Sequence, residues 1–277
     1  MSPDPVQPKR RYADTRLGQM HLTIWPGPAD ATLPPIVCVH PVPYSGRYFD
    51  GFAAGLSRHV SVIAPDLPGY GGSDPLAEPV GIADYAAATA DALQDLGIGR
   101  YVPLGYHVGS VVAGELALAR PKRVPAMVFV GYPFLSEEER AKQRSGLGSG
   151  IVNGEDLESL RRRWRATVNS RAAGVRFEPA FVNFVEELRA GENAWFGFHA
   201  TFHYPMEQRL AKICQPVFVV NGQGSMKAPT EAAVERLADS NCIEMAVPAK
   251  GIFELQPDRL AFAITQWLGT VSGSGRD

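Results

Sequence analysis

Short apolar runs alternate along most of the chain with stretches of helical periodicity. We expect the apolar runs to form strands, at residues 21–25, 34–39, 60–65, 101–106, 126–132, 216–222 and 242–247. The helical stretches between them cover residues 82–97, 108–120, 230–239 and 256–269. Strands that are apolar on both faces are typical of a mostly parallel sheet covered by helices on each side. The alternation therefore predicts an α/β fold.

One segment interrupts this alternation. Between residues 134 and 212 the chain shows charged helical patterns, at 136–144, 155–168, 178–190 and 194–203, and no clear strand. Because this segment is too long for a simple connection, we expect a helical cap at 134–212, inserted between two parts of one core, 1–133 and 213–277. Its position in the chain would put the cap over the edge where open α/β sheets bind ligands.

Composition narrows the class of protein. The 277 residues carry a net charge of −2, which gives no electrostatic reason to expect a nucleic acid or a membrane as partner. The basic run at 161–165 follows several acidic residues and is expected to be a solvated helix face. No apolar stretch approaches the ~18 residues of a membrane span, and the first residues lack the apolar segment of a signal peptide.

The three cysteines, Cys38, Cys214 and Cys242, are odd in number and lie in or beside apolar runs. Buried, reduced thiols fit this pattern better than a disulfide framework. Together with the absence of targeting signals, it predicts a cytoplasmic protein. The sequence leaves the oligomeric state open.

Residues 105–109, Gly-Tyr-His-Val-Gly, have the spacing of the G-x-S-x-G turn that holds a serine nucleophile between a strand and a helix. The central residue is His107 instead. An imidazole has a pKa near the operating pH, so His107 could serve as a general base or acid. It could also act as a nucleophile, bind a ligand, or simply fill the site. The sequence alone does not choose among these roles.

Four further segments, in the right order, resemble the α/β-hydrolase fold superfamily. They are "VCVHPVP" (37–43), "VIAPDLPGYGGSD" (62–74), "PVFVVNGQGSMKAP" (216–229) and "VPAKGIFELQPDRLAFAITQWL" (247–268). The segment at 134–212 resembles the superfamily's cap. The resemblance implies an α/β-hydrolase fold, in which a mostly parallel sheet is flanked by helices and a helical cap is inserted after the sixth strand.

The same resemblance shows where the chain departs from the superfamily. His107 stands at the position of the nucleophile, Ser225 at that of the acid, and Ile252 at that of the histidine. Ordinary serine hydrolysis needs a hydroxyl, a base and a group that orients the base. Ser110 is close in sequence, but we expect it to serve helix–strand packing. The resemblance still implies an oxyanion hole, made by the backbone N–H groups of Val42 and Val108.

Donors aimed at an oxyanion, without a nucleophile, suit proton transfer next to a carbonyl better than acyl transfer. We therefore predict an atypical enzyme of epimerase or isomerase type, as in natural-product tailoring, that acts on a small molecule or a peptide. A His-dependent hydrolase or lyase and a non-catalytic ligand-binding pseudoenzyme are the alternatives. The side chains expected to bind substrate surround the predicted crevice: His40, Tyr44, Tyr106, Trp195, His199, His203, Ser225 and Ile252.

We expect no cofactor. The glycines of residues 67–74 do not form a phosphate-binding pattern, which argues against a nucleotide. His199 and His203 are four residues apart and share a helical face, so with His107 they could form a three-histidine metal site. No carboxylate supports such a site, and the preferred interpretation is that both histidines line a pocket.

Overall fold

A computed structural model describes residues 6–147 and 156–273. Within these residues eight strands form one sheet in the order β1-β2-β4-β3-β5-β6-β7-β8. The strands are β1 (Lys9–Thr15), β2 (Gly18–Trp25), β3 (Ile36–Val39), β4 (Val62–Pro65), β5 (Val102–Tyr106), β6 (Met127–Val130), β7 (Val217–Gln223) and β8 (Ser240–Pro248). The pairings of β1 with β2 and of β2 with β4 are antiparallel, and all the others are parallel. The predicted α/β fold with a mostly parallel sheet is confirmed.

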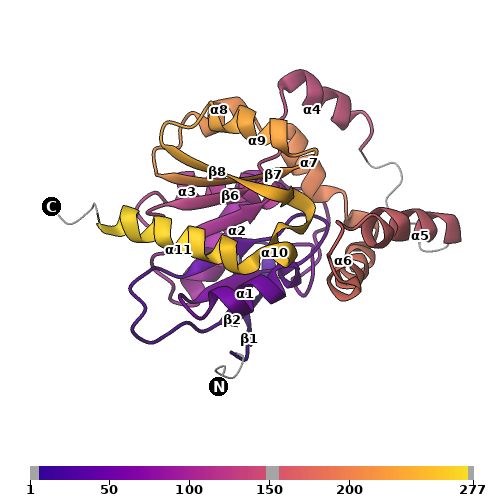
Figure 1. Ribbon diagram of the computed structural model, residues 1–277. Coiled ribbons are helices and arrows are strands. Elements are labelled where there is room, and N and C mark those ends of the chain that lie inside the picture. The colour runs from indigo at the N-terminus through magenta and orange to yellow at the C-terminus, as the bar shows by residue number, and fades with distance from the viewer. Residues whose placement is uncertain (1–5, 148–155, 274–277) are drawn as a thin grey trace.

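Helices cover both faces of the sheet, and in Figure 1 α1, α10 and α11 lie in front of it. The helices outside the 134–212 segment are η1 (Gly46–Phe49), α1 (Asp50–Leu56), α2 (Ile82–Asp95), α3 (Val108–Ala119), α9 (Lys227–Val234), η4 (Ala249–Gly251), α10 (Ile252–Leu255) and α11 (Pro257–Gly273). Successive residues of β3 face opposite cores, as a pleated strand requires. Val37 and Val39 pack with α2 and α3, whereas Ile36 and Cys38 pack with α1 and α11.

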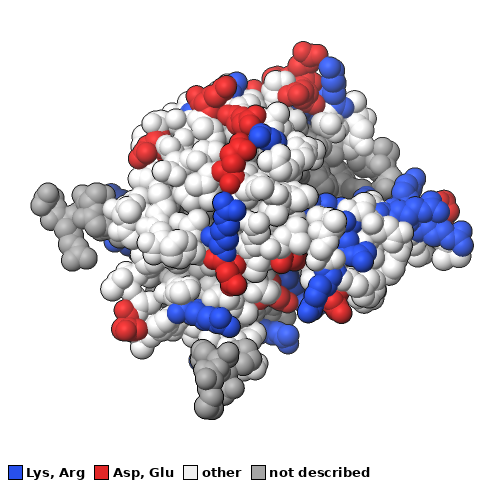
Figure 2. Space-filling model, in the orientation of Figure 1, with Lys and Arg blue, Asp and Glu red and all other residues white. Residues whose placement is uncertain are grey.

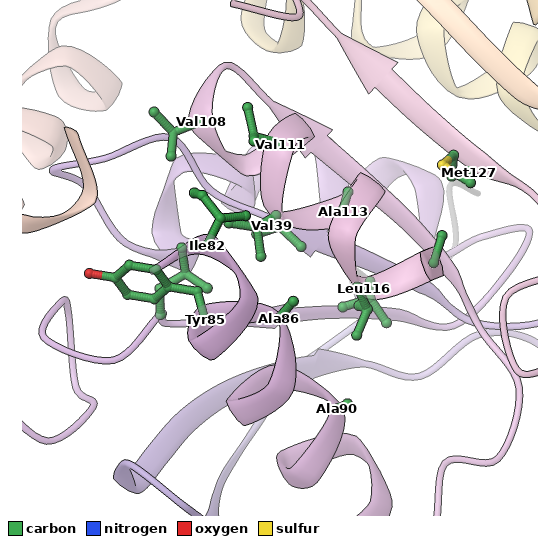
Figure 3. Packing of buried hydrophobic residues seen from close by; sticks show 14 of the residues in the cluster. Val39, Ile82, Tyr85, Ala86, Ala90, Val108, Val111, Ala113, Leu116 and Met127 are labelled. Carbon is green, nitrogen blue, oxygen red and sulfur yellow. The ribbon is translucent and has the colours of Figure 1, made fainter. Parts of the chain in front are cut away.

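The core between α2, α3 and the sheet contains many small residues beside larger ones such as Tyr85 and Leu116, and the small residues let the helices approach closely. Figure 3 shows Ala86 and Ala90 of α2 near Leu116 of α3, with Val39 of β3 close by. Every residue of α3 from Val108 to Ala117 is buried. The first turn of α3, which begins the candidate site, is therefore held rigidly in the middle of the molecule.

One strand and one helix boundary illustrate where the structure differs from the sequence-based expectations. The strand β1 was not predicted, because its sequence, KRRYADT, is polar and buries only Ala13. It is an edge strand, held in place by its antiparallel pairing with β2. The helix expected at 230–239 is α9, which ends at Val234. The helix cannot continue to residue 239, because the chain already pairs with the sheet there. The Asp239 carbonyl accepts a hydrogen bond from Val217 N–H of β7 (3.0 Å).

The described part of the segment between β6 and β7 contains several helices and no strand, as predicted. Its elements are α4 (Glu137–Arg144), α5 (Leu157–Trp164), the π-helical turn η2 (Arg165–Asn169), α6 (Phe177–Ala190), η3 (Gly191–Asn193), α7 (Phe196–His203) and α8 (Met206–Leu210). Residue 155, the start of one expected helix, lies outside the described residues. In Figure 1, α5 and α6 stand to one side of the sheet, while α7 and α8 contact α3.

The basic run of α5 is largely the solvated face that was expected. Arg161 and Arg162 are exposed, and Figure 2 shows blue side chains gathered at this outer end of the molecule. Arg163 differs, because it turns inward and its Nη1 lies 3.0 Å from Oε1 of the buried Glu187. This ion pair joins α5 to α6 within the inserted segment.

The cysteines are free thiols, but only Cys38 is buried. Cys214 and Cys242 are exposed, so the prediction of three buried thiols is wrong for these two. Cys242 lies on β8 at the edge of the sheet, where one side of the strand has no neighbour to cover it. None of the helices described here is long and apolar enough to cross a lipid bilayer.

Candidate active site

His107 forms the sharp turn between β5 and α3. Its backbone has φ 52° and ψ −121°, and it is the one non-glycine residue with a positive φ in the described part of the chain. Its N–H donates to the Val130 carbonyl (3.2 Å) and its carbonyl accepts from Ser110 N–H (2.9 Å). Strained backbone of this kind persists where the surrounding structure fixes it, commonly at functional sites. The strand–turn–helix predicted for residues 105–109 is confirmed.

Two glycines make this turn possible. A Cβ on Gly105 would lie 2.2 Å from the Gly109 carbonyl oxygen, and a Cβ on Gly109 would lie 2.0 Å from the Val39 carbonyl oxygen. Neither contact is compatible with a side chain. The spacing in the sequence therefore reflects how closely α3 approaches β5 and β3.

Ser110 has the structural role expected of it. Its side chain is fully buried, and its Oγ donates to the Gly105 carbonyl (2.7 Å) behind the turn. A hydroxyl held in this way is inaccessible to a substrate, and its hydrogen-bond partners among the described residues are backbone carbonyl oxygens.

We therefore expect a fluorophosphonate, which labels activated serines, to leave the protein unmodified. Intact-mass spectrometry of the treated protein measures this directly. One-to-one labelling of Ser110, or of the exposed Ser225 on the loop after β7, would contradict this assignment of the site.

A cavity of about 370 Å³ opens beside His107, at the carboxyl edge of the sheet and under the inserted helices. Five of the residues predicted from the sequence line it: Val42, Tyr44, Tyr106, His107 and Ser225. Residues that the sequence did not single out complete the lining, and those with polar side chains include Arg171, Asn183, Lys250 and Glu254.

Burial controls the protonation of His107. Desolvation disfavours the charged imidazolium and lowers the pKa of His107 to about 4. The imidazole is therefore neutral at neutral pH, with one nitrogen free to donate a hydrogen bond and the other free to accept one.

Three tyrosines form a stacked column along one wall of the cavity. The rings of Tyr44 and Tyr48 are 5.7 Å apart, and those of Tyr48 and Tyr106 are 5.4 Å apart. Burial raises the pKa of Tyr44 to about 12 and raises the pKa values of Tyr48 and Tyr106 well above the usual value. The column is therefore an uncharged, aromatic surface.

Of the two expected oxyanion donors, Val42 lines the cavity, whereas Val108 is buried and is not part of the lining. Val108 is the first residue of α3, where an N–H has no partner within the helix. Helix α7 lies directly against Val42, since a Cβ on Gly197 would be 2.5 Å from Val42 Cγ1. Tyr70 holds α7 there, because its hydroxyl accepts from Gly197 N–H (2.8 Å).

His40 does not reach the cavity, although we expected it to bind substrate. Its ring is fully buried, Nε2 accepts from Leu67 N–H (2.9 Å), and Nδ1 donates to the Pro41 carbonyl (3.1 Å). These bonds fix one neutral tautomer, and burial lowers the pKa of His40. The residue ties the loop after β3, which carries Val42, to the loop after β4.

Four other expected binding residues are also not part of the cavity lining. Ile252, the first residue of α10, is fully buried in the apolar core. Trp195 packs edge-on against Phe196. His199 and His203 lie ring to ring, 4.1 Å apart, and His203 Nδ1 donates to the His199 carbonyl (2.9 Å).

The three-histidine metal site considered from the sequence therefore does not form. Of the three histidines, His107 alone lines the cavity. Across residues 6–147 and 156–273, no group of three or more histidine, cysteine, aspartate or glutamate side chains could hold a metal ion.

One feature of the sequence could have led to two of the polar lining residues that were not predicted. Lys250 and Glu254 each stand two residues from Ile252, within a segment already expected to border the pocket. Lys250 Nζ donates to the Ala166 carbonyl (3.0 Å) and to Ser170 Oγ (3.0 Å), which links η4 to η2. Thr167, Arg171 and Asn183 come from the inserted helices and had no such signal, because only the packing of η2 and α6 brings them to the cavity.

A strained elbow at the carboxyl edge of a mostly parallel sheet, covered by inserted helices, defines the class of α/β hydrolases. The model of the alpha/beta hydrolase fold family matches residues 34–239, and the chain belongs to this family.

Curated relatives are similar at low identity. The chain is 28% identical over 244 residues to a putative carbamate hydrolase, RutD, of Shigella flexneri serotype 5b, a match that covers 81% of this chain and 86% of that protein. It is 30% identical over 193 residues to the putative carbamate hydrolase RutD of Cronobacter sakazakii, covering 66% and 70% of the two chains.

Solved structures share the fold. A hydrolase from Pseudomonas aeruginosa PA01 has a TM-score of 0.78 at 18% identity, with 94% of this chain and 98% of that chain covered. The enol-lactonase from Burkholderia xenovorans LB400 has a TM-score of 0.76 at 16% identity, covering 94% and 100%. At these identities the likeness establishes the architecture alone.

Proposed function

We propose that this protein is an atypical enzyme of the α/β-hydrolase fold that moves a proton at a carbon next to a carbonyl group. Its substrate is a small molecule or a peptide, and its reaction is of epimerase or isomerase type. One observation carries the proposal: a neutral imidazole, in place of a hydroxyl, stands at the strained elbow beside the cavity. We assign residues 1–133 and 213–277 to the core and residues 134–212 to a cap that encloses the substrate.

The replaced triad positions support a reaction without a serine nucleophile. Ser225 stands at the position of the acid and cannot orient a base as a carboxylate does. Ile252 stands at the position of the histidine and is fully buried. No residue at these positions can therefore activate a hydroxyl.

The remaining parts suit an enolate. When a proton leaves the carbon, negative charge develops on the carbonyl oxygen, and we assign its stabilisation to the N–H groups of Val42 and Val108. One such donor contributes roughly 3 kcal/mol where an oxyanion forms. His107 would contact the carbonyl end of the substrate, and Tyr44, Tyr106 and Ser225 would contact the rest of it.

A His-dependent hydrolase is the second candidate. The relatives in Shigella flexneri and Cronobacter sakazakii are putative carbamate hydrolases, and their similarity extends over most of this chain. In such a reaction His107 would attack the carbonyl carbon and form an acyl-imidazole. A single probe can separate the two candidates.

N-acetyl-L-phenylglycine methyl ester in D₂O provides that test, because it carries both an α-hydrogen and a cleavable ester. We expect the α-proton NMR signal to disappear faster with the protein than in buffer, without release of methanol. Loss of a positioned proton-transfer group or its partner typically costs about 10² to 10⁴ in rate, and we expect His107→Ala to fall in this range.

His203→Ala is the matched control, since His203 is exposed and lies away from the cavity. It should exchange the α-hydrogen at the wild-type rate. Release of methanol by the wild type and not by His107→Ala would instead establish the hydrolase. Binding of the ester with neither reaction would leave a ligand-binding protein and overturn the proposed enzyme.

A further inference from the structure

We propose that Glu254 is the residue that takes the proton from the substrate and returns it, while His107 acts as a neutral hydrogen-bonding group. The inference rests on the proposed proton transfer and names its base. It comes from the position and surroundings of the Glu254 carboxyl group.

Glu254 lies on α10, the short helix that follows β8 and η4, and it lines the same cavity as His107. Its side chain is partly buried. Its Oε2 is fully buried and has no hydrogen-bond partner among the described residues. A buried polar atom without a partner costs stability, so it calls for another explanation, such as a catalytic role.

The cations near this carboxyl group are engaged elsewhere. Lys250 donates to the Ala166 and Ser170 oxygens. Arg171 donates to the Val168 carbonyl (2.9 Å) and to the Val175 carbonyl (3.0 Å). No ion pair to Glu254 occurs within the described part of the chain, so its charge is not compensated.

The other titratable groups around Glu254 do not change this picture. In the shared cavity they are the phenols of Tyr44, Tyr48 and Tyr106 and the imidazole of His107. Glu254 also borders a neighbouring cavity, where the charged residues pair among themselves: Arg47 with Asp50 and Glu186, and Arg176 with Glu178. On α11, which packs against α10, Asp258 and Arg259 are exposed to solvent.

Burial acts on the two candidate bases in opposite directions. It raises the pKa of Glu254 to about 7 and lowers the pKa of His107 to about 4. The carboxylate is therefore the stronger base of the two. A base is most effective when its pKa is near the operating pH. Glu254, whose pKa is raised, therefore suits the role of proton acceptor, and the neutral His107 suits the role of hydrogen-bond donor.

The step balances without any other reactant. The C–H bond next to the carbonyl breaks, and its proton bonds to a carboxylate oxygen of Glu254. The electron pair of that bond forms the carbon–carbon double bond of the enolate, while the carbonyl electrons move to oxygen. The N–H groups of Val42 and Val108 and the neutral imidazole of His107 bind that oxygen. Return of the proton to carbon restores the carbonyl and the carboxylate, and in D₂O the returned hydrogen is deuterium.

The test uses N-acetyl-L-phenylglycine methyl ester with the wild type and Glu254→Gln, which keeps the shape and removes the base. We expect α-deuteration to fall by about 10² to 10⁴ in kcat, with KM little changed. Glu178→Gln is the matched control, because it makes the same chemical change at a residue that borders only the neighbouring cavity. It should react at the wild-type rate, and Glu254→Asp should keep part of the activity.

The pH profile identifies the base. Since the carboxylate is the active form, the wild-type rate should rise with pH up to about 7 and then level off. If His107 were the base, the rate would instead hold down to a pH of about 4. Infrared spectroscopy without substrate should show a protonated carboxyl band that disappears as the pH rises through about 7. This band should be absent in Glu254→Gln.

The outcomes distinguish a failure of the role assigned to Glu254 from a failure of the proposed function. Exchange by the wild type with an unchanged rate in Glu254→Gln would refute the role of Glu254 and leave the proposed function standing. A wild type that does not exchange the α-hydrogen would overturn both. A Glu254 carboxyl band that titrates in the ordinary range of a glutamate would contradict the assignment independently of the substrate.

Discussion

Gly109→Ala is expected to prevent the accumulation of folded protein. The added Cβ would lie 2.0 Å from the Val39 carbonyl oxygen and 2.9 Å from the His40 carbonyl oxygen. Both are backbone atoms at the end of a central strand, so they cannot move without displacing the sheet. We expect a cost above about 4 kcal/mol, which is exceptional for a single substitution and comparable with the total stability of many domains.

Gly114→Ala in the same helix is the matched control. There the Cβ would meet only side-chain ends, Phe129 Cζ at 3.2 Å and Ile213 Cδ1 at 3.3 Å, which can shift by the small amount needed. Alanine is also favoured over glycine within a helix by about 1 kcal/mol. Urea unfolding of both variants measures the difference. Wild-type stability in Gly109→Ala would mean that the elbow is not packed as closely as described.

The sequence predicted those features that are determined by residues close together along the chain. The apolar strands and the turn around His107 follow from local pattern, because glycine spacing records a local steric need. The strand β1 could not be predicted in this way, since KRRYADT has no apolar run and is defined only by its pairing with β2. Its partner, and not its own composition, makes it a strand.

The lining of the cavity depends on contacts between distant segments, and there the sequence was less informative. His40 and Ile252 occupy positions that border a pocket in the superfamily pattern, yet both side chains turn into the core. Arg171 and Asn183 reach the cavity only because η2 and α6 fold over it. Glu254 was visible as a polar neighbour of Ile252, but the sequence could not show that its carboxyl group lacks a partner.

One buried ion pair fixes the end of the inserted segment to the helix that begins at the elbow. Glu115 is a charged residue within the otherwise apolar α3, and its side chain is 8% exposed. Its carboxylate accepts from Arg209 Nη2 (2.5 Å), Arg209 Nε (2.9 Å) and the Tyr204 hydroxyl (2.7 Å). Since Arg209 is on α8 and Tyr204 follows α7, the pair holds both helices against α3.

Arg209→Met is expected to lower the free energy of unfolding by about 3 kcal/mol. Removing one partner of a buried pair costs roughly 3 to 5 kcal/mol, because the other charge is left uncompensated, and the partial exposure of Arg209 favours the lower end. Lys142→Met is the matched control: its ion pair with Glu138 is also short, at 2.9 Å, but both side chains are exposed, so stability should change little.

The double variant Glu115→Gln, Arg209→Met tests the cause. It removes both charges and keeps an acceptor for the Tyr204 hydroxyl, so we expect it to recover most of the lost stability in urea unfolding. A double variant as unstable as Arg209→Met would show that the arginine acts through packing rather than charge. Because α7 also covers Val42 through Gly197, Arg209→Met should in addition weaken binding of the ester probe, while Lys142→Met should leave it unchanged.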